Sequence, residues 1–359
     1  IFPHNFDHPR SYPEWEDPSL RDHYPDWITT YREKRYPYLF LNPRLKRLAR
    51  HYDLILTAGF HVLPVLSLDK PVVLLPVGGE LTQMPFGSDR LVTEIQSFLY
   101  RKRIRKISRV LTDQEDCIWA ARLLGIGDRI VRFPFLTDAL SVERNINDHL
   151  RKELCHRYRE YDAIFFNPSR KNLDPNRVDY KGTDKLMRAY RRFIDGPTRG
   201  RFLMVCGLHG NDTGRFKQLV SELELDNHIE YTGHLSLPDL HAWFSLENVV
   251  VFDQFNGNLD ALGGIQREAM ALGRRVVSST DTHAPGFVKA YGPDCPLLPA
   301  FNEQEILDAM MSLTGGDQHA LSNDSTTREW IMKHVHYESR IGELIELLRE
   351  VSIENPSTG

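Results

Sequence analysis

Two successive series of alternating strands and helices constrain the fold of this chain more than any other feature of its sequence. In the first series, apolar runs such as 53–59 and 71–77 alternate with segments whose apolar residues recur at helical spacing. After residue 160 the alternation starts again, with apolar runs at 161–169, 201–208 and 248–255. Continuous apolar strands that alternate with helices are typical of a parallel sheet covered on both faces. The sequence therefore predicts an α/β protein with two Rossmann-like domains.

The interruption between the two series sets the expected domain boundaries. We expect an N-terminal domain over residues 1–150, in which residues 1–40, rich in Pro, His, Tyr and Trp, are irregular. Because the chain begins at Ile1 and not at Met, the sequence leaves open whether residues 1–40 are complete. A second domain is expected over residues 151–325. A long helix over 326–352 is expected to pack back on the N-terminal domain.

Bulk composition excludes several classes of protein. A formal net charge of −4 gives no signal for nucleic-acid binding. No apolar run reaches the roughly 18 residues that a membrane-spanning helix needs. The four cysteines are widely scattered, with no Cys-x-x-Cys pair, so neither a zinc site nor a disulfide framework is expected. We therefore expect a cytoplasmic protein without a metal site.

The segment FDQFNGNLDALGGIQREAMALG, which begins at Phe252, carries the most specific pattern in the chain. An apolar strand enters a glycine-rich loop that holds Asp260, and a second acid, Glu268, stands eight positions later beside a run of small residues. Glycines such as Gly263 and Gly264 let backbone N–H groups approach a phosphate closely, and a helix N-terminus favours anions. By itself, however, an acid at a helix start is more often a residue that caps the helix or complements its dipole.

Four motifs, in order along the chain, resemble one known family. They are NPSR, KGTDKL, VCGLHG with IEYTGHLSLPDL, and DALGGIQREAMALG. Together they are similar to the nucleotide-binding domain of retaining GT-B glycosyltransferases, glycosyltransferase family 4 in particular, over residues 160–350 and more loosely over 50–135. The resemblance implies the GT-B architecture, in which two Rossmann-like domains with parallel sheets face each other across a cleft. It also implies transfer of a hexosyl group from a nucleotide-diphosphate sugar to an acceptor hydroxyl with retention of configuration, without a metal or any cofactor beyond the donor co-substrate.

The resemblance assigns roles to the acid pair and its glycines. The Glu-x7-Glu pattern of the family reads Asp260-x7-Glu268 in this chain, so the first acid is one methylene shorter. Glu268 is expected to bind the ribose hydroxyls of the donor. Asp260 is expected to face the hydroxyls of the donor sugar in the catalytic site. Gly263 and Gly264 are expected to bind the diphosphate through backbone N–H groups.

Two basic residues upstream complete the expected donor site. Arg170 follows a strand, and Lys181 stands at the entrance to a helix. The resemblance implies that both neutralise the donor diphosphate, Arg170 by forked hydrogen bonds and Lys181 as a point charge. The family spaces these two residues more closely, so Arg177, which lies between them, competes with Arg170 for the role. Without the resemblance, Arg170 and Lys181 would be interpreted as two ordinary surface cations.

The loop VGGEL ends a buried strand of the first series. The resemblance implies that Gly78, Gly79 and Glu80 close over the donor sugar from the first domain and belong to the catalytic site. Glu80 takes the position of an Asp in the family, whereas Val77 takes the position of a His and cannot hydrogen-bond through its side chain. His61 follows the neighbouring strand and is a candidate substitute, although a structural histidine is the simpler interpretation. For the glycines, the alternative is an ordinary turn with positive φ.

The acceptor and the cellular partner are the least constrained features. Residues 100–109 hold six basic side chains, a pattern typical of a solvated helix face. The same run also suits peripheral contact with an anionic membrane, and the acceptor is a glycan, a lipid-linked molecule or a small molecule. Two other functions stay open. One is a non-catalytic GT-B relative that binds nucleotide or glycan as a scaffold subunit. The other is a nicotinamide-dependent oxidoreductase, which the lack of a Gly-x-Gly-x-x-Gly motif between a strand and a helix disfavours.

Overall fold

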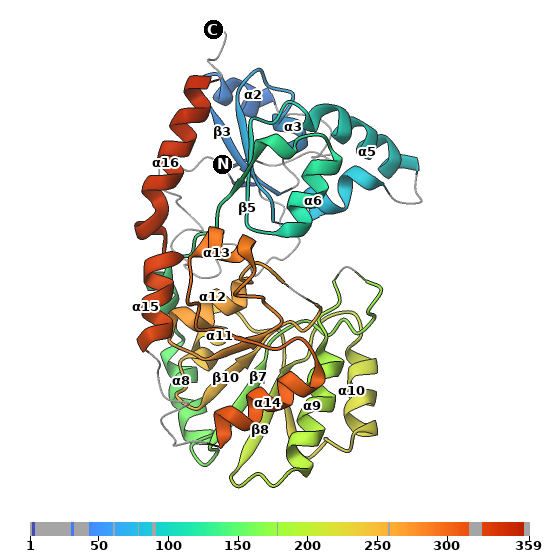
Figure 1. The fold of residues 1–359 in the computed structure, drawn as a ribbon, viewed down its shortest axis with the longest axis vertical. Helices are drawn as coiled ribbons and strands as arrows, with labels where there is room; N and C mark the ends of the chain where they lie inside the picture. The colour runs from blue at the N-terminus through green and yellow to red at the C-terminus, as the bar shows by residue number, and fades with distance from the viewer. Residues whose placement is uncertain are drawn as a thin grey trace. The chain divides into compact units, whose positions relative to one another are not determined.

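The chain folds as two compact units (Figure 1). Unit 1 comprises Ile1–Phe135 with Arg340–Gly359, and unit 2 comprises Leu136–Ser339. The computed structural model describes residues 2–3, 30–31, 43–59, 62–77, 79–87, 91–177, 179–257, 259–315 and 325–354. Each unit contains a parallel sheet with helices around it, so the expected α/β fold with two parallel-sheet domains is confirmed.

Unit 1 is built on a four-stranded parallel sheet in the order β3-β4-β5-β6. Its strands are Ile55–Ala58, Val72–Leu75, Arg109–Thr112 and Ile130–Arg132. Its helices are α2 (Pro43–Ala49), α3 (Val62–Val65), α4 (Gly79–Thr82), α5 (Leu91–Ile104) and α6 (Glu115–Leu123), and the short strands β1 (Phe2–Pro3) and β2 (Thr30–Tyr31) pair with each other. Among the strands described in this sheet, the spatial order is the same as the order along the chain. Each new strand is therefore added on the same side of the previous one.

The last helix, α16 (Tyr337–Glu354), contributes most of its length to unit 1. Val351 is buried, and the Arg109 guanidinium of β5 forms an ion pair with Glu354 at 2.5 Å. The Arg340 guanidinium lies 5.7 Å from the ring centroid of Phe133, which belongs to the same unit. The C-terminal helix therefore belongs to the same unit as the first strands of the chain.

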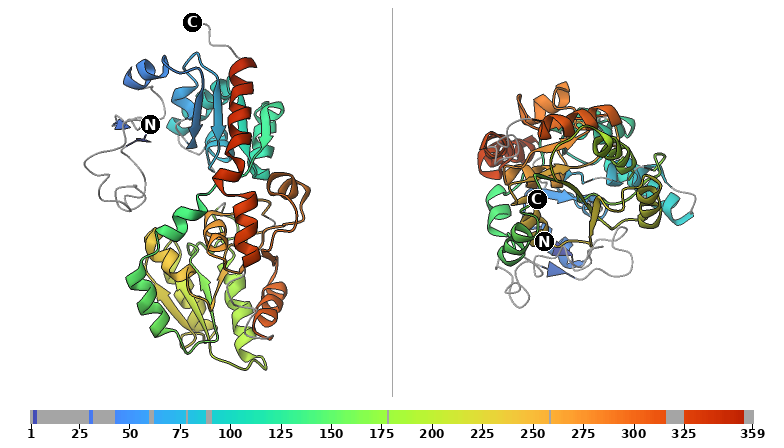
Figure 2. Two further views of the ribbon diagram at one scale, coloured as in Figure 1. Left: turned by 90° about the vertical axis from the view of Figure 1, so that its left-hand side faces the viewer. Right: turned by 90° about the horizontal axis from the view of Figure 1, so that it is seen from below.

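Unit 2 is built on a six-stranded parallel sheet in the order β12-β11-β10-β7-β8-β9. In chain order its strands are β7 (Ala163–Asn167), β8 (Phe202–Gly207), β9 (Ile229–Thr232), β10 (Val249–Phe252), β11 (Val276–Ser278) and β12 (Leu298–Pro299). Its helices are α7 (Ala139–Arg144), α8 (Asp148–Arg157), α9 (Thr183–Asp195), α10 (Thr213–Glu222), α11 (Leu237–Phe244), α12 (Gly264–Ala271), α13 (Pro285–Tyr291), α14 (Glu303–Thr314) and α15 (Ser325–His334). Figure 2 shows these helices on both faces of the sheet.

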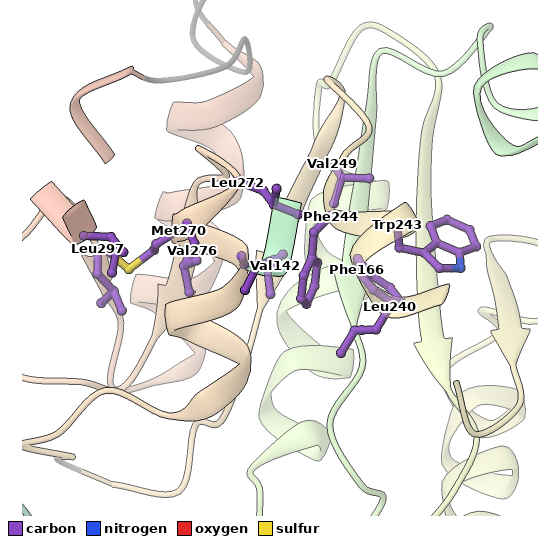
Figure 3. Close-up of a cluster of buried hydrophobic side chains, with 14 of the residues drawn as sticks. Val142, Phe166, Leu240, Trp243, Phe244, Val249, Met270, Leu272, Val276 and Leu297 are labelled. Atoms are coloured by element: carbon purple, nitrogen blue, oxygen red, sulfur yellow. The ribbon is translucent and has the colours of Figure 1, made fainter. Parts of the chain in front are cut away.

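Alternating strand residues supply two separate cores, one on each face of this sheet. Phe166 of β7 faces the core that α11 and α12 cover, whereas its neighbour Phe165 faces the core that α9, α10 and α14 cover. Figure 3 shows Phe166 against Trp243 and Phe244 of α11, with ring centroids 5.1 and 5.9 Å apart. Truncation of such a buried ring, as in Phe166→Ala, is expected to cost about 3–5 kcal/mol.

The division between the units falls earlier in the chain than the expected boundary at residue 150. Helices α7 and α8, over residues 139–157, pack on unit 2 through the buried Val142 and Leu154. Side-chain caps fix both helix starts: Asp138 accepts a hydrogen bond from the Ser141 N–H, and Asn147 accepts one from the Leu150 N–H, at 3.0 and 3.1 Å. Two capped helices with buried apolar residues belong to the domain that they cover.

Candidate functional site

The sheet of unit 2 reverses its direction of growth between β7 and β10. The chain starts at β7, adds β8 and β9 on one side, and then returns to place β10 on the other side of β7. In open α/β sheets, ligands bind outside the carboxyl ends of the strands at such a switch point, between the loops that leave the two strands. Arg170 lies in the first of these loops, and the glycine-rich segment with Asp260 lies in the second.

Polar side chains fasten the two loops to each other at their bases. Asn167 donates its side-chain N–H to the carbonyl of Phe252 at 2.6 Å, and the Ser169 hydroxyl donates to the carboxylate of Asp253. Asp253 directly follows β10 and is only 1% exposed. Sequence reasoning missed Asp253, although an acid immediately after a buried strand at this edge was the available signal.

Lys171 is a second residue that the sequence did not single out. Its ammonium group is fully buried and donates to the side-chain oxygen of Asn167 at 2.5 Å and to the carbonyl of Ser169 at 2.7 Å. It also lies 5.1 Å from the ring centroid of Phe216. Burial lowers the pKa of Lys171 to about 8. Lys171 thus fixes the loop after β7 through hydrogen bonds on its buried side. The adjacent Arg170, in contrast, is exposed.

Arg170 and Arg177 differ in whether their guanidinium groups already have a hydrogen-bond partner in the protein. Both nitrogens of the Arg177 fork donate to Asp179, each at 2.9 Å. In the part of the chain that the structure describes, Arg170 forms no ion pair or side-chain hydrogen bond, and it is exposed. Burial lowers the pKa of Lys181 first, and the positive charge of Arg170 lowers it further. Of the two arginines, Arg170 has the free fork that diphosphate binding needs.

Lys181 leads into α9 and points back toward the β10 loop. Its ammonium group donates to the side-chain oxygen of Gln254 at 2.7 Å, and burial lowers its pKa. The next residue, Gly182, has φ +66°, and a Cβ there would lie 2.3 Å from the carbonyl oxygen of Phe255. The backbone of Phe255 donates to the Lys181 carbonyl at 2.8 Å. Only glycine permits this contact, which brings the start of α9 against the glycine-rich loop.

The glycine-rich loop is anchored at the end of β11 and then starts α12. The Leu259 N–H donates to the Ser279 carbonyl at 2.8 Å, which places the partly buried Asp260 at the carboxyl edge of the sheet. The Gly263 N–H donates to the side chain of Gln266 at 3.1 Å, and a Cβ on Gly263 would meet the Gln254 amide at 2.9 Å. Helix geometry leaves the next N–H groups of α12 without an intrahelical acceptor, so this end can bind an anion.

Glu268 stands in the second turn of α12, with its side chain 23% exposed. A Cβ on Gly264 would lie 4.0 Å from its carboxylate, so Glu268 leans back over the first turn of the helix. The buried ring of His241, on α11, places Nε2 3.4 Å from the other carboxylate oxygen. The carboxylate is therefore held beside the anion-binding end of α12 and keeps an exposed edge for hydroxyl groups.

His209 lies near the cationic side chains of the candidate site, and its own charge state follows from its surroundings. His209 follows β8, and its ring lies 5.1 Å from that of His234 in an edge-to-face arrangement. Burial first, and then His234, Lys171 and Arg170, lower the pKa of His209 to about 4. His209 is consequently neutral near pH 7, and the positive charge at the carboxyl ends of β7 and β8 belongs to lysine and arginine.

The expected loop of unit 1 is described only in part. His61 and Gly78 lie outside the described residues. Gly79 begins α4, and the fully buried Glu80 accepts a hydrogen bond from the Val77 N–H. Glu80 therefore has a local structural role within unit 1, and its contact with a donor sugar stays a prediction. Val77 is 56% exposed.

The basic run at residues 100–109 divides between buried and exposed positions. Tyr100, Ile104 and Ile107 are fully buried, and the Arg101 guanidinium donates to the Pro85 carbonyl at 2.5 Å. Lys102, Arg105 and Lys106 are exposed. No helix in the described ranges is both long and apolar enough to cross a membrane. Nor does any cluster of three or more His, Cys, Asp or Glu side chains in those ranges have an arrangement that could hold a metal ion.

The chain is similar to known proteins in part of its sequence and in its fold. Residues 175–325 match the family described as glycosyl transferases group 1. The structure of Anabaena HepE in complex with UDP is similar with a TM-score of 0.62 at 14% identity, covering 90% of this chain and 86% of HepE. The fold is GT-B. Sucrose-phosphate synthase from Thermosynechococcus elongatus gives a TM-score of 0.59 at 16% identity, covering 86% of this chain and 76% of the synthase.

A glycosyltransferase from Rickettsia africae shares the same GT-B fold. Its TM-score is 0.57 at 15% identity, and the alignment covers 90% of this chain and 85% of that enzyme. No curated protein sequence matches this chain. The group 1 match contains Arg177, Lys181, Asp260 and Glu268, whereas Arg170 lies just before it.

Proposed function

We propose that this GT-B protein is a nucleotide-sugar glycosyltransferase that binds its donor between the β7 and β10 loops. The observation that carries the proposal is the convergence at this switch point of Arg170, Lys181 and the N-terminus of α12, with Glu268 beside them. The group 1 match supports it, as do the structures of HepE in complex with UDP and with UDP-glucose.

In the proposed reaction, the bond between the anomeric carbon and the diphosphate oxygen breaks, and the acceptor hydroxyl oxygen bonds to that carbon. The bonding electrons leave with the diphosphate, whose growing negative charge Arg170, Lys181 and the N–H groups of α12 stabilise. The hydroxyl proton passes to the departing diphosphate on the same face of the sugar, so configuration is retained. Glu268 binds the ribose hydroxyls, and Asp260 faces the transferred hexose. No metal takes part in this scheme.

The proposal also covers the acceptor, contact with a membrane and the location in the cell. The acceptor is a glycan, a lipid-linked molecule or a small molecule, and the exposed lysine and arginine side chains of residues 102–106 suit peripheral contact with an anionic membrane face. A cytoplasmic location fits the four cysteines, Cys117, Cys155, Cys206 and Cys295, which are all free.

A thermal-shift panel of UDP, GDP, ADP and NAD, followed by mass spectrometry of donor sugars, tests the function. A nucleoside diphosphate at about a hundredfold excess over its Kd should stabilise the protein by about 2.7 kcal/mol. Lys181→Met should reduce that shift, whereas Lys152→Met, which removes an exposed lysine of α8 in the same unit, should reduce it far less. A protein that no nucleoside diphosphate stabilises would refute the proposal, and stabilisation by NAD alone would point to an oxidoreductase.

A non-catalytic GT-B relative is the second candidate. The observations that favour it are Val77, which replaces a hydrogen-bonding side chain, and the shorter acid Asp260. Such a protein would bind the nucleoside diphosphate through the same residues of unit 2. It would release no free nucleoside diphosphate from any donor sugar, with or without acceptors, in the mass-spectrometric assay.

A further inference from the structure

A continuous chain of side-chain hydrogen bonds runs beneath the proposed donor site. It begins at the Lys181 ammonium, which donates to the side-chain oxygen of Gln254 at 2.7 Å. The Gln254 amide N–H donates in turn to the buried Asp253 carboxylate at 3.1 Å. Gln266 of α12 donates to the same carboxylate oxygen at 3.3 Å and accepts the Gly263 N–H at 3.1 Å. The chain therefore connects the lysine before α9 with the N-terminus of α12.

Each group in this chain has only one orientation that satisfies its neighbours. Lys181 can only donate and the Asp253 carboxylate can only accept, so the Gln254 amide must present oxygen to Lys181 and nitrogen to Asp253. Gln266 has the same constraint, because its second amide hydrogen goes to the Ser278 hydroxyl at 2.9 Å. A buried carboxylate thus sets the direction of every bond in the network.

The backbone of Gln254 provides a second, independent observation. Its φ is +52°, a left-handed conformation that non-glycine residues seldom adopt. The Gln254 carbonyl accepts the N–H and the hydroxyl of Ser279, at 3.0 and 3.1 Å, which hold that conformation in place. Unfavourable backbone conformations of this kind gather at functional sites, where the surrounding structure maintains them.

We infer that Asp253 and Gln254 are positioning residues that preorganise the two anion-binding elements of this site, the Lys181 ammonium and the N-terminus of α12, as one unit for a diphosphate. The inference rests on the proposed function and adds to it the means by which the site is held ready before the donor arrives. Neither residue needs to touch the donor, since each acts through Lys181 or Gln266. Preorganised charges stabilise a leaving diphosphate without reorganisation during the reaction.

Gln254→Asn tests the link to Lys181. Asparagine tolerates the left-handed conformation and keeps an amide, but it is one methylene too short to reach from the Asp253 carboxylate to the ammonium group. The tightest nucleoside diphosphate of the panel and its parent nucleoside are titrated by calorimetry. Affinity for the diphosphate should fall about tenfold, the equivalent of one charge-assisted hydrogen bond, and affinity for the nucleoside should stay within about twofold.

Glu224→Asn is the matched control, because Glu224 has φ +54° and lies outside the network. It should leave both affinities unchanged. If the wild-type protein binds a nucleoside diphosphate and Gln254→Asn binds it equally well, the inference is overturned while the proposed function stands. If the wild-type protein binds none, the proposed function fails and this inference fails with it.

Asp253→Asn adds a second measurement, the pH dependence of diphosphate affinity, which a purely structural role of Asp253 would not change. The charged groups that act on Lys181 are Asp253, Arg170 and Asp179, and the Asp253 charge raises the Lys181 pKa against the effect of burial. Without that charge Lys181 deprotonates at lower pH, so diphosphate affinity should be lost at lower pH than in the wild type. An unchanged pH profile, with nucleoside and diphosphate weakened equally, would reduce Asp253 to a structural residue and overturn its part in the inference.

Discussion

Gly182→Ala tests whether the close contact between the α9 entrance and the β10 loop sets the geometry of the donor site. The residue has φ +66°, which costs an alanine about 1–2 kcal/mol. The new Cβ would also lie 2.3 Å from the carbonyl oxygen and 2.4 Å from the carbonyl carbon of Phe255. Because these are backbone atoms, no side-chain rotation relieves the clash, and the overpacking adds about 1–3 kcal/mol. We expect a total loss of about 2–5 kcal/mol.

Gly125→Ala supplies a control with nearly the same backbone conformation. Gly125 has φ +73°, and no atom lies within 4 Å of a Cβ added there, so the variant bears only the conformational cost of about 1–2 kcal/mol. The two glycines lie in different units. Amide hydrogen exchange read by mass spectrometry gives opening free energies for peptides of each unit separately, which a single unfolding midpoint does not.

The two variants should also differ in ligand binding. The shifted loop in Gly182→Ala separates Lys181 from Gln254, so affinity for a nucleoside diphosphate should fall, whereas Gly125→Ala should bind normally. Equal decreases of the opening free energy in the two variants would show that only the backbone conformation at φ > 0 matters. The contact with the Phe255 backbone would then contribute nothing to stability. Normal diphosphate binding by a destabilised Gly182→Ala protein would show that the contact does not position Lys181.

Three further predictions concern the donor site. Arg170→Met should weaken nucleoside diphosphate binding about tenfold by the loss of charge-assisted hydrogen bonds. Arg177→Met should have little effect, because Arg177 already pairs with Asp179. A larger loss of affinity in Arg177→Met than in Arg170→Met, measured by calorimetry, would reject this prediction. Glu268→Gln should lower the affinity for nucleoside and nucleoside diphosphate by the same factor, about tenfold, and loss for the diphosphate alone would exclude ribose binding. Burial lowers the pKa of Lys181, which is cationic only below that pKa, so diphosphate affinity should decline at a lower pH than for an exposed lysine; a profile that Lys181→Met leaves unaltered would contradict this.

Local patterns in the sequence were enough to determine the class of fold. Alternation of apolar strands with helices follows from the periodicity of each element, and it correctly predicted two parallel-sheet units with a glycine-rich loop before a helix. The order of the strands was not available from these patterns. The reversal of strand order between β7 and β10, which marks the candidate site, depends on how distant segments of the chain pair.

The tertiary structure decided which polar residues can act together. The hydrogen bond from Lys181 to Gln254 joins residues 73 positions apart, and the one from Ser169 to Asp253 spans 84 positions. No local pattern reports such pairs, and for this reason Lys171 and Asp253 were missed and the choice between Arg170 and Arg177 stayed open. Hydrogen-bond direction and burial depend on atoms that only the folded chain brings within about 3 Å of each other.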